Sequence, residues 1–324
     1  MFATIERVIR RDPARRGLAS LRVGGEWLCA GQFELAAESL ARRARRVAIV
    51  TGFPVVTDSV TIETDGPPGA VYLAQALLAV GIDVVLVSDP LGVPVLRCAA
   101  GERNLDVSVA EFPFEWAESL EIPRAMKGAT TCAHSDSWTT EFLDTETQRG
   151  LTHLVAIERP GPSQSQGECL NLRGESIDGY VGKTHRLFEQ IAEHGLEIVT
   201  VGICDGGNEI GCGAIPWESL PPVETTAIRR QTACRVATDH LILAGVSNWG
   251  AYGLAVALLH RRKHIDAMRS WDVENERQLI EHLVAETGIV DGITGLAEAT
   301  VDGLPLETYL QGLAGVRRAV GLDP

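Results

Sequence analysis

The sequence predicts an α/β fold in which a layered, mostly parallel sheet is flanked by helices. Short runs rich in β-branched residues recur along the chain without strict polar alternation, as expected of strands buried on both faces. Helical patterns lie between these runs, and such alternation is typical of a parallel sheet. The predicted strands are 46–50, 83–87, 151–157, 197–203 and 240–244, and the clearest helices are 69–80, 184–194 and 251–262.

The first predicted strand, 46–50, leads into a polar segment with two acids. Glu63 and Asp65 precede a Gly-Pro-Pro-Gly turn, and proline is sterically favoured at the first position of a helix. Ligands of open α/β sheets bind beyond the carboxyl ends of the strands, so both acids are candidates for a site. The alternative is that Asp65 caps the helix and that Glu63 is solvated.

The segment between the second and third predicted strands breaks the alternation. Aromatic and proline residues cluster between 101 and 148 without a clear period. No linker marks a domain boundary elsewhere in the chain. We therefore predict a single domain over residues 1–324, with an insertion or a lid at 101–148.

The third predicted strand, 151–157, ends directly at two charged residues, Glu158 and Arg159. Glu158 at the end of an apolar strand either faces a site or pairs with the adjacent Arg159, and both interpretations stay open here. A polar stretch follows that includes Asn171 and Arg173 and leads to the predicted helix 184–194.

The segment after the fourth predicted strand is the most informative, and it reads Cys-Asp-Gly-Gly-Asn-Glu-Ile-Gly-Cys-Gly over 204–213. Its glycines allow positive φ and a close approach of the backbone to a ligand. Asp205, Asn208 and Glu209 supply oxygen atoms of the kind that Mg²⁺, Mn²⁺ or Ca²⁺ prefers. The alternative is an Asx turn and a helix cap without a ligand. The glycine spacing does not match the dinucleotide fingerprint.

The fifth predicted strand leads into Gly-Val-Ser-Asn-Trp-Gly before a long helix. Ser247 or Asn248 is a predicted N-cap, and exposed amides at that helix start could receive a substrate carboxylate. Plain capping is the alternative. A later loop with Asp291 and Glu298 is also rich in glycine and acids, and the sequence assigns it no use.

Composition narrows the class of protein. The chain has 29 Lys and Arg against 43 Asp and Glu, a formal charge of -14, which disfavours binding to nucleic acid. Seven scattered cysteines without a C-x-x-C pair fit a reducing cytoplasm. The most apolar stretch, 70–87, is interrupted by polar residues and glycine, so no membrane span is expected. The arginine-rich N-terminus suggests an amphipathic helix and not a secretory signal.

Several catalytic motifs are absent from the sequence. It has no phosphate-binding loop of the G-x-x-x-x-G-K-[ST] type, so nucleotide-driven chemistry has little support. It has no G-x-S-x-G elbow of an α/β-hydrolase. What remains is a set of acidic, glycine-rich loops.

These loops resemble those of the D-glutamate cyclase family. The resemblance implies conversion of D-glutamate to 5-oxo-D-proline and a divalent metal held in an acidic cavity. The matching stretches follow one another in order through most of the chain, at 51–54, 63–70, 153–161, 205–211, 245–252 and 291–303.

On this resemblance we expect a lyase that closes D-glutamate with loss of water, or adds water in reverse. The metal would be Mn²⁺ or Mg²⁺, with Ca²⁺ as a further candidate, and no nucleotide is needed. We expect Glu158 as general base, in a role that could exchange with Glu209, and Asp205 as a further catalytic residue. The expected metal ligands are Glu63, Asp65, Asp205, Asn208 and Glu209. The expected substrate-binding residues are Arg159, Asn171, Lys183, Gly206, Gly207, Ser247 and Asn248, with Arg186 as an alternative cation for the α-carboxylate.

Two other functions use the same features. A metal-dependent phosphatase would also need acidic, glycine-rich loops, and a non-catalytic protein could bind a metal or an amino acid there. In each case the expected partner is a small molecule, with no nucleic acid and no membrane. A homo-oligomer is an open expectation, because no segment identifies an interface.

Overall fold

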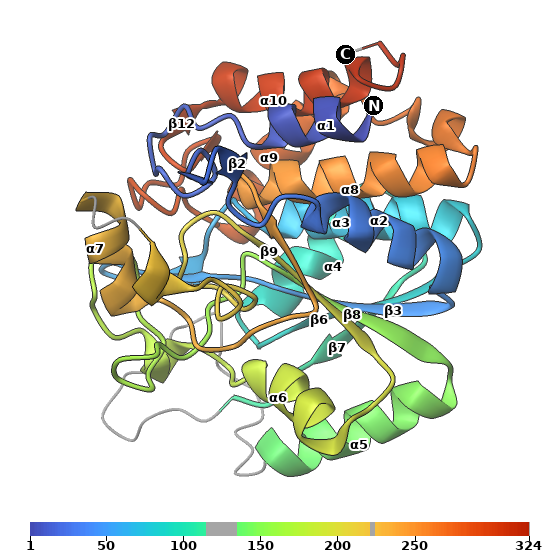
Figure 1. The fold of residues 1–324 in the computed structure, drawn as a ribbon. Coiled ribbons are helices and arrows are strands. Elements are labelled where there is room, and N and C mark those ends of the chain that lie inside the picture. The colour runs from blue at the N-terminus through green and yellow to red at the C-terminus, as the bar shows by residue number, and fades with distance from the viewer. Residues whose placement is uncertain (115–134, 221–223, 324) are drawn as a thin grey trace.

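The computed structural model describes residues 1–114, 135–220 and 224–323. A six-stranded sheet, parallel throughout, forms the centre of the molecule (Figure 1). The predicted fold class is therefore confirmed. In spatial order the strands are β10 (His240–Leu243), β9 (Val199–Cys204), β8 (Leu151–Ile157), β3 (Arg46–Thr51), β6 (Asp83–Ser88) and β7 (Ser108–Glu111).

The order of the strands locates the place where a ligand is expected. From β3 the chain adds β6 and then β7 on one side, and it then returns to the other side of β3 with β8, β9 and β10. The direction of building thus reverses between β3 and β8. In doubly wound sheets, ligands bind at such a switch point, beyond the carboxyl ends of the strands.

Helices cover both faces of the sheet, and β3 shows why its sequence is apolar throughout. Val47 and Ile49 pack in the core on the side of α3 and α8, whereas Ala48 and Val50 pack in the core on the side of α5 and α6. Side chains alternate across a strand, so both sets must be apolar. Figure 1 shows α3 and α8 above the sheet and α5 and α6 below it. The helices are α1 (Phe2–Ile9), α2 (Gln32–Arg43), α3 (Pro67–Ala79), α4 (Gly92–Glu102), α5 (Ser135–Gln148), α6 (His185–His194), α7 (Glu224–Thr232), α8 (Ser247–Arg261), α9 (Val273–Thr287) and α10 (Leu306–Arg318).

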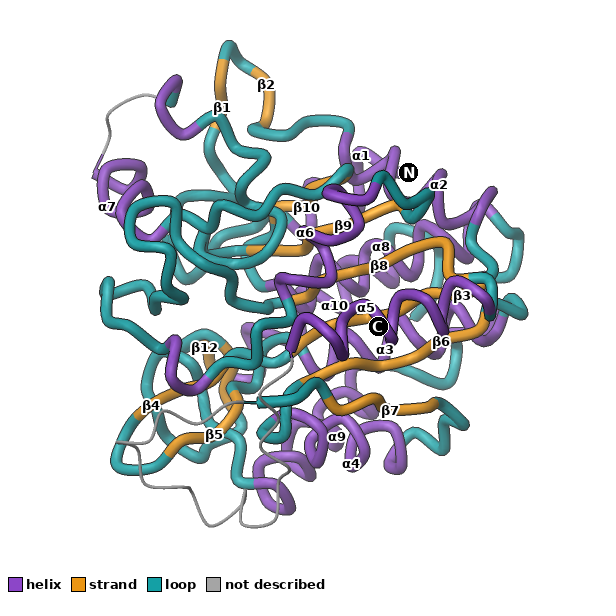
Figure 2. Tube along the Cα trace, turned by 90° about the horizontal axis from the view of Figure 1, so that it is seen from below, coloured by secondary structure: helices purple, strands orange, loops and turns teal. Residues whose placement is uncertain are grey.

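The central helices α3 and α8 pack against each other above the sheet, and nearly every residue of each is buried. A helix that is apolar all round belongs in an interior, and here α1 and α10 form a further layer over α8. The N-termini of α3 and α8 both lie at the edge of the sheet where the parallel strands end. This edge is where the loops gather, at the left of Figure 2.

Short hairpins and turns surround this edge. The antiparallel pairs are β1 (Arg22–Val23) with β2 (Glu26–Trp27), β4 (Pro54–Val56) with β5 (Val60–Ile62), and β11 (Thr300–Val301) with β12 (Leu304–Pro305). Short 3₁₀ turns span Asp178–Tyr180, Trp217–Ser219 and Ile265–Met268.

Part of the segment predicted to be irregular, 101–148, belongs to regular structure. β7 is the edge strand of the central sheet, and α5 packs against α6. The remaining part of that prediction falls on residues 115–134, which lie outside the described residues, so a lid there stays a prediction. The N-terminal helix is present as α1. Among the residues described, no helix combines the length and the apolar character needed to cross a membrane.

Candidate active site

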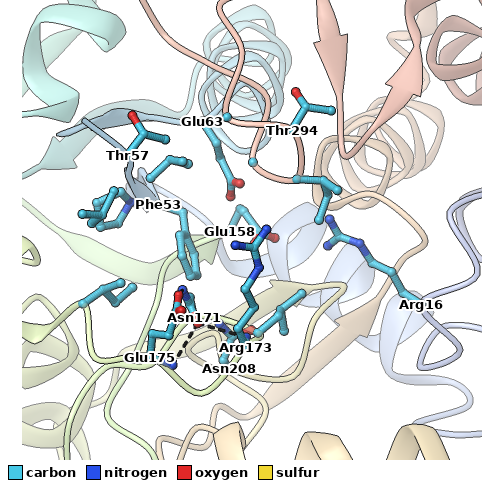
Figure 3. A pocket seen from close by; sticks show the side chains of 18 residues that line it. Arg16, Phe53, Thr57, Glu63, Glu158, Asn171, Arg173, Glu175, Asn208 and Thr294 are labelled. Carbon is cyan, nitrogen blue, oxygen red and sulfur yellow. Dashed lines mark hydrogen bonds between the residues drawn. The ribbon is translucent and has the colours of Figure 1, made fainter. Parts of the chain in front are cut away.

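A cavity of about 200 Å³ lies beyond the carboxyl ends of β3 and β8, at the switch point of the sheet. The segment after β3 and the loop 292–295 form one side, and the turn from Asn171 to Ile177 forms another. Glu63, Glu158, Asn208 and Arg16 face the same space (Figure 3). The cavity thus joins loops that follow different strands, as the sequence predicted for Glu63, Glu158 and Asn208.

Glu158 is the first residue after β8, and its backbone is unusual. Its φ is 44°, in the left-handed region that side chains other than glycine rarely adopt, while its N–H donates to the carbonyl of Ile203 on β9 at 3.2 Å. The side chain is buried, and Oε2 has no hydrogen-bond partner among the described residues. Burial, followed by the nearby Asp205 carboxylate, raises the pKa of Glu158 well above its ordinary value. These features fit a group that accepts and returns a proton.

The loop after β9 holds its acids at the same edge. The Glu209 carboxylate accepts from the N–H of Gly206 at 2.8 Å and of Gly207 at 2.6 Å. Burial and Asp205 raise the pKa of Glu209, although these two amides oppose the shift. Gly207 has a φ of 104°, which confirms that the loop needs glycine there. The predicted role of Gly206 and Gly207 in binding substrate is thus corrected, because their amides serve Glu209.

Asn208 in this loop points one side-chain atom at the protein and one at the cavity. Its Nδ2 donates to the carbonyl of Leu170 at 2.8 Å, whereas the buried Oδ1 has no hydrogen-bond partner in the described segments. Fixing of the amide by Leu170 leaves Oδ1 as a free acceptor in the wall of the cavity. That placement suits the supporting ligand predicted from the sequence.

Asp65 and Asn248 cap each other's helices. The Asp65 carboxylate accepts from the N–H groups of Ser247 and Asn248 at the start of α8, each at 2.8 Å. The Asn248 Oδ1 accepts from Gly66 and Gly69 at the start of α3, at 2.9 and 2.8 Å. Burial and Asp205 raise the pKa of Asp65 to about 7, against the effect of the amides.

This arrangement corrects the role predicted for Ser247 and Asn248. Both residues are buried, and the amides expected to be exposed to a substrate carboxylate already bind the carboxylate of Asp65. The capping alternative for Asp65 is wrong in its target, because Asp65 caps α8 and not α3, the helix that it precedes, and Glu63 is buried instead of solvated. The Asp65 carboxylate nevertheless stays close to Asp205 and Asp302, so it also belongs to the acidic cluster.

The sequence did not reveal Arg16 and Asp302 as parts of the site. The guanidinium of Arg16 pairs through separate nitrogens with Asp205 and with Asp302, and its side chain is 9% exposed. Burial raises the pKa of Asp302 well above its ordinary value, although Arg16 opposes the shift. The turn with Asp302 is held by Asp291, whose Oδ2 accepts from Gly303 at 2.7 Å. The only signal in the sequence was the glycine- and acid-rich stretch 291–303.

The carboxyl groups of this site fit a divalent cation. Oxygen atoms of Asp65, Asp205 and Asp302 lie within 4.8 Å of one another, and so do those of Glu158, Asp205 and Glu209. Asp205 belongs to both groups. Within the part of the chain that the structure describes, its Oδ2, the Oδ2 of Asp302 and the Oε2 of Glu158 are buried without hydrogen-bond partners. A buried carboxylate oxygen needs a donor or a cation, and an all-oxygen set of this kind suits Mg²⁺ or Mn²⁺. Glu63 stands beside these groups, and burial and Asp65 raise its pKa well above the ordinary value.

Three cations predicted to bind the substrate lie elsewhere. Arg159 is fully buried and donates to Thr184, to Asp89 and to the carbonyls of Gly52 and Gly182, so it ties loops together behind the site. Lys183 is exposed and lines a different surface pocket. Arg186 lines that pocket too and pairs with Asp136, Glu189 and Glu193. These assignments are wrong as cavity contacts.

Arg173 is the cation that reaches the cavity from this region. Its N–H donates to the Asn171 Oδ1 at 2.9 Å, and Asn171 in turn donates through Nδ2 to Glu175 at 2.7 Å. Asn171 therefore lines the cavity, its side chain holds the turn that presents Arg173, and its role in binding substrate stays a prediction. In Figure 3 the Arg173 guanidinium points toward the Glu63 and Glu158 carboxylates. Within the described part of the chain, no ion pair is found for it.

Comparison with known proteins identifies the family of this chain. A family model described as "D-glutamate cyclase-like, C-terminal" matches residues 5–317. The human protein "D-glutamate cyclase, mitochondrial" is 31% identical over 331 residues, which cover 93% of this chain and 48% of the human protein. The chain thus spans about half the length of that relative. Because the family model extends over nearly the whole sequence, the chain belongs to the D-glutamate cyclase-like family.

Proposed function

We propose that this protein closes D-glutamate into 5-oxo-D-proline and water with the help of a divalent cation, and that it is a lyase. The observation that carries this proposal is a cavity in a member of this family where, among the described residues, the buried Glu158 Oε2 has no hydrogen-bond partner and the Arg173 guanidinium has no ion pair. The printed name of the human relative supports the same reaction. Location in the cytoplasm stays a prediction from the cysteines, of which none among the described residues forms a disulfide.

The residues that would hold the cation are Asp205 together with Asp65 and Asp302, or with Glu158 and Glu209. Glu63 and Asn208 could supply further oxygen ligands. When bound, Mn²⁺ or Mg²⁺ would supply a Lewis acid that makes the γ-carboxylate of the substrate electrophilic and stabilises negative charge on it.

The chain's own residues would bind and orient the substrate. Arg173 is suited to the α-carboxylate, because a guanidinium binds a carboxylate through paired hydrogen bonds. Phe53, Val55 and Ile293 offer an apolar wall for the methylene groups. Holding the amine and the γ-carboxylate of one molecule close together lowers the barrier by orientation.

Glu158 would move the protons. Ring closure forms a bond between the amine nitrogen and the carbon atom of the γ-carboxylate and breaks one of the two bonds between that carbon and oxygen. Two protons pass from the ammonium nitrogen to the leaving oxygen, which departs as water. The partnerless Oε2 of Glu158 lies in the cavity wall, and a raised pKa makes this carboxylate a better proton acceptor.

The test is turnover by metal-stripped protein given D-glutamate or L-glutamate, with and without Mn²⁺ or Mg²⁺, with product followed by chiral chromatography. We expect 5-oxo-D-proline from the D-isomer only, and only with metal. Glu158→Gln should keep the circular dichroism of the wild type and lose roughly 100-fold in kcat. Glu298→Gln, which changes an exposed carboxylate outside the cavity, should keep full turnover.

Other outcomes would point elsewhere. Product formation by metal-free protein would contradict the role of the cation. Phosphate release from simple phosphoesters, without 5-oxoproline, would favour the phosphatase. Thermal stabilisation by glutamate and metal without any turnover would favour a non-catalytic protein that binds these ligands.

A further inference from the structure

The acidic cluster of this site contains far more negative than positive charge. Asp205 and Asp302 are buried beside Glu63, Asp65, Glu158 and Glu209. Among the residues that the structure describes, Arg16 is the cationic side chain that forms ion pairs with this cluster. Buried carboxylates that lose a counter-charge must take up protons or another cation.

Arg16 stands where a bound cation would be expected. Its guanidinium bridges Asp205 and Asp302, which together with Asp65 present oxygen atoms within 4.8 Å of one another. A guanidinium and a divalent cation would need overlapping sets of these oxygens and would also repel each other in a poorly hydrated site. The two cations should therefore exclude each other.

The surroundings of Arg16 allow the side chain to leave while the backbone stays. The N–H groups of Arg16 and Gly17 donate to the Asp12 carboxylate at 2.8 and 2.6 Å, which fixes this turn. Arg16 also lines a second, adjacent cavity of about 520 Å³, together with Arg15, Arg229 and Asp302. The buried Nε of Arg16 has no hydrogen-bond partner among the residues that the structure describes. A change of rotamer into the second cavity would return the side chain to solvent.

We propose that Arg16 is a built-in cation that occupies the acidic site in the metal-free protein and competes with the divalent cation for it. This inference rests on the proposed function, because it takes the acidic cluster as the metal site. It assigns the N-terminal segment a role in setting metal affinity. In the metal-free state Arg16 stabilises the cluster, and on metal binding its side chain turns into the second cavity.

The test measures Mn²⁺ binding and thermal stability of metal-stripped protein. Arg16→Met should bind Mn²⁺ roughly tenfold more tightly than wild type by titration calorimetry, since the competing cation is gone. Its Tm without metal should be lower than that of wild type, and Mn²⁺ should raise it by more. Arg11→Ala removes an exposed arginine from the same segment and should match wild type in both measurements.

Free guanidinium ion supplies a second readout that does not depend on activity. At millimolar concentration it should raise the Tm of metal-free Arg16→Ala and weaken its binding of Mn²⁺, and it should do neither to wild type. If an Arg16 variant folds only with Mn²⁺ or guanidinium present, the proposal is supported. A variant that stays unfolded with both would overturn it.

The outcomes separate this inference from the proposed function. Equal or weaker Mn²⁺ binding by Arg16→Met, with normal binding by wild type, overturns the role of Arg16 and leaves the cyclase proposal intact. Absence of Mn²⁺ and Mg²⁺ binding in both proteins overturns the role of Arg16 together with the metal-assisted mechanism.

Discussion

The same type of residue does two different tasks at Arg159 and Arg173. Arg159 follows Glu158 directly, but its side chain is fully buried and bonded to Asp89, Thr184 and two carbonyls. Arg173 is exposed at the cavity, on a turn that Asn171 stabilises. A guanidinium whose N–H groups already donate to protein acceptors has few donors free for a ligand. A guanidinium in a cavity wall that forms no ion pair within the described residues can bind a carboxylate. Position in the sequence did not separate these cases.

Replacement of Arg173 tests its assignment to the α-carboxylate. Arg173→Ala should lower kcat/KM for D-glutamate by roughly 10- to 100-fold, mainly through KM, because a charge-assisted hydrogen-bond pair to the bound substrate is lost. Steady-state kinetics of Arg173→Ala and of a control variant, Arg262→Ala, measure kcat and KM. Arg262→Ala removes an exposed arginine far from the cavity and should change neither constant. An unchanged KM in Arg173→Ala would contradict the assignment.

The identity of the acids could be predicted, but not that of their cation. Glu158 and Asp205 directly follow the ends of β8 and β9, and Glu63 lies in the segment after β3, so the rule for parallel sheets brings them together. Arg16 is separated from Asp205 by 189 positions and reaches it only through tertiary packing. Asp302 lies beyond the last strand of the central sheet. No local pattern carries information on such distant pairs.

Among the elements, α3 and α8 depend on each other through their N-termini. Asp65, just before α3, accepts from the amides that begin α8, and Asn248 in α8 accepts from Gly66 and Gly69. The first amides of a helix lack partners within that helix, so each side chain satisfies donors that would otherwise be buried and unpaired. The exchange also fixes Asp65 beside Asp205.

Loss of this exchange should lower stability more than loss of an ordinary cap. Asn248→Ala should lower the free energy of unfolding by about 2 to 4 kcal/mol, since the buried N–H groups of Gly66 and Gly69 lose their acceptor. Asn275→Ala, at the partly exposed start of α9, should cost clearly less. Urea unfolding of metal-free protein measures both values. Equal losses would show that the Asn248 contacts add nothing beyond local capping.

The predictability of each element follows from its burial. The strands β3, β6, β8, β9 and β10 are buried and β-branched, and the structure places each within two residues of its predicted bounds. β7 was missed because Ser108–Glu111 is half exposed at the edge of the sheet and carries an acid. The short hairpins around the site have no periodicity long enough to detect. The buried strands of the sheet can therefore be predicted from the sequence, whereas the conformation of the loops that form the site depends on tertiary contacts.

At the scale of the whole molecule, negative charge is concentrated where the strands end. The formal charge of the chain is -14, and several of its acids are buried around one cavity instead of being spread over the surface. Burial of like charges raises their pKa values, so the metal-free protein holds protons that an unfolded chain would release. A divalent cation would take the place of these protons. Metal binding and pH should therefore be linked.

This linkage predicts how stability changes between pH 6.5 and pH 8. The pKa values of Glu63, Glu158 and Asp302 are raised in the folded state, so the unfolded chain binds fewer protons than the folded one. The free energy of unfolding of the metal-free protein should therefore fall as pH rises. The expected slope is about 1.4 kcal/mol per pH unit for each proton that the folded state retains. His153 and His185, whose pKa burial lowers to about 4, act in the opposite sense but only below about pH 6.5. Unfolding at several pH values with and without Mg²⁺ measures the effect, which Mg²⁺ should abolish and Glu158→Gln should reduce. Stability of the metal-free protein that stays constant or rises over this range would mean that these carboxyl groups are already ionised, and the cluster would then need no exchange of protons to accept a cation.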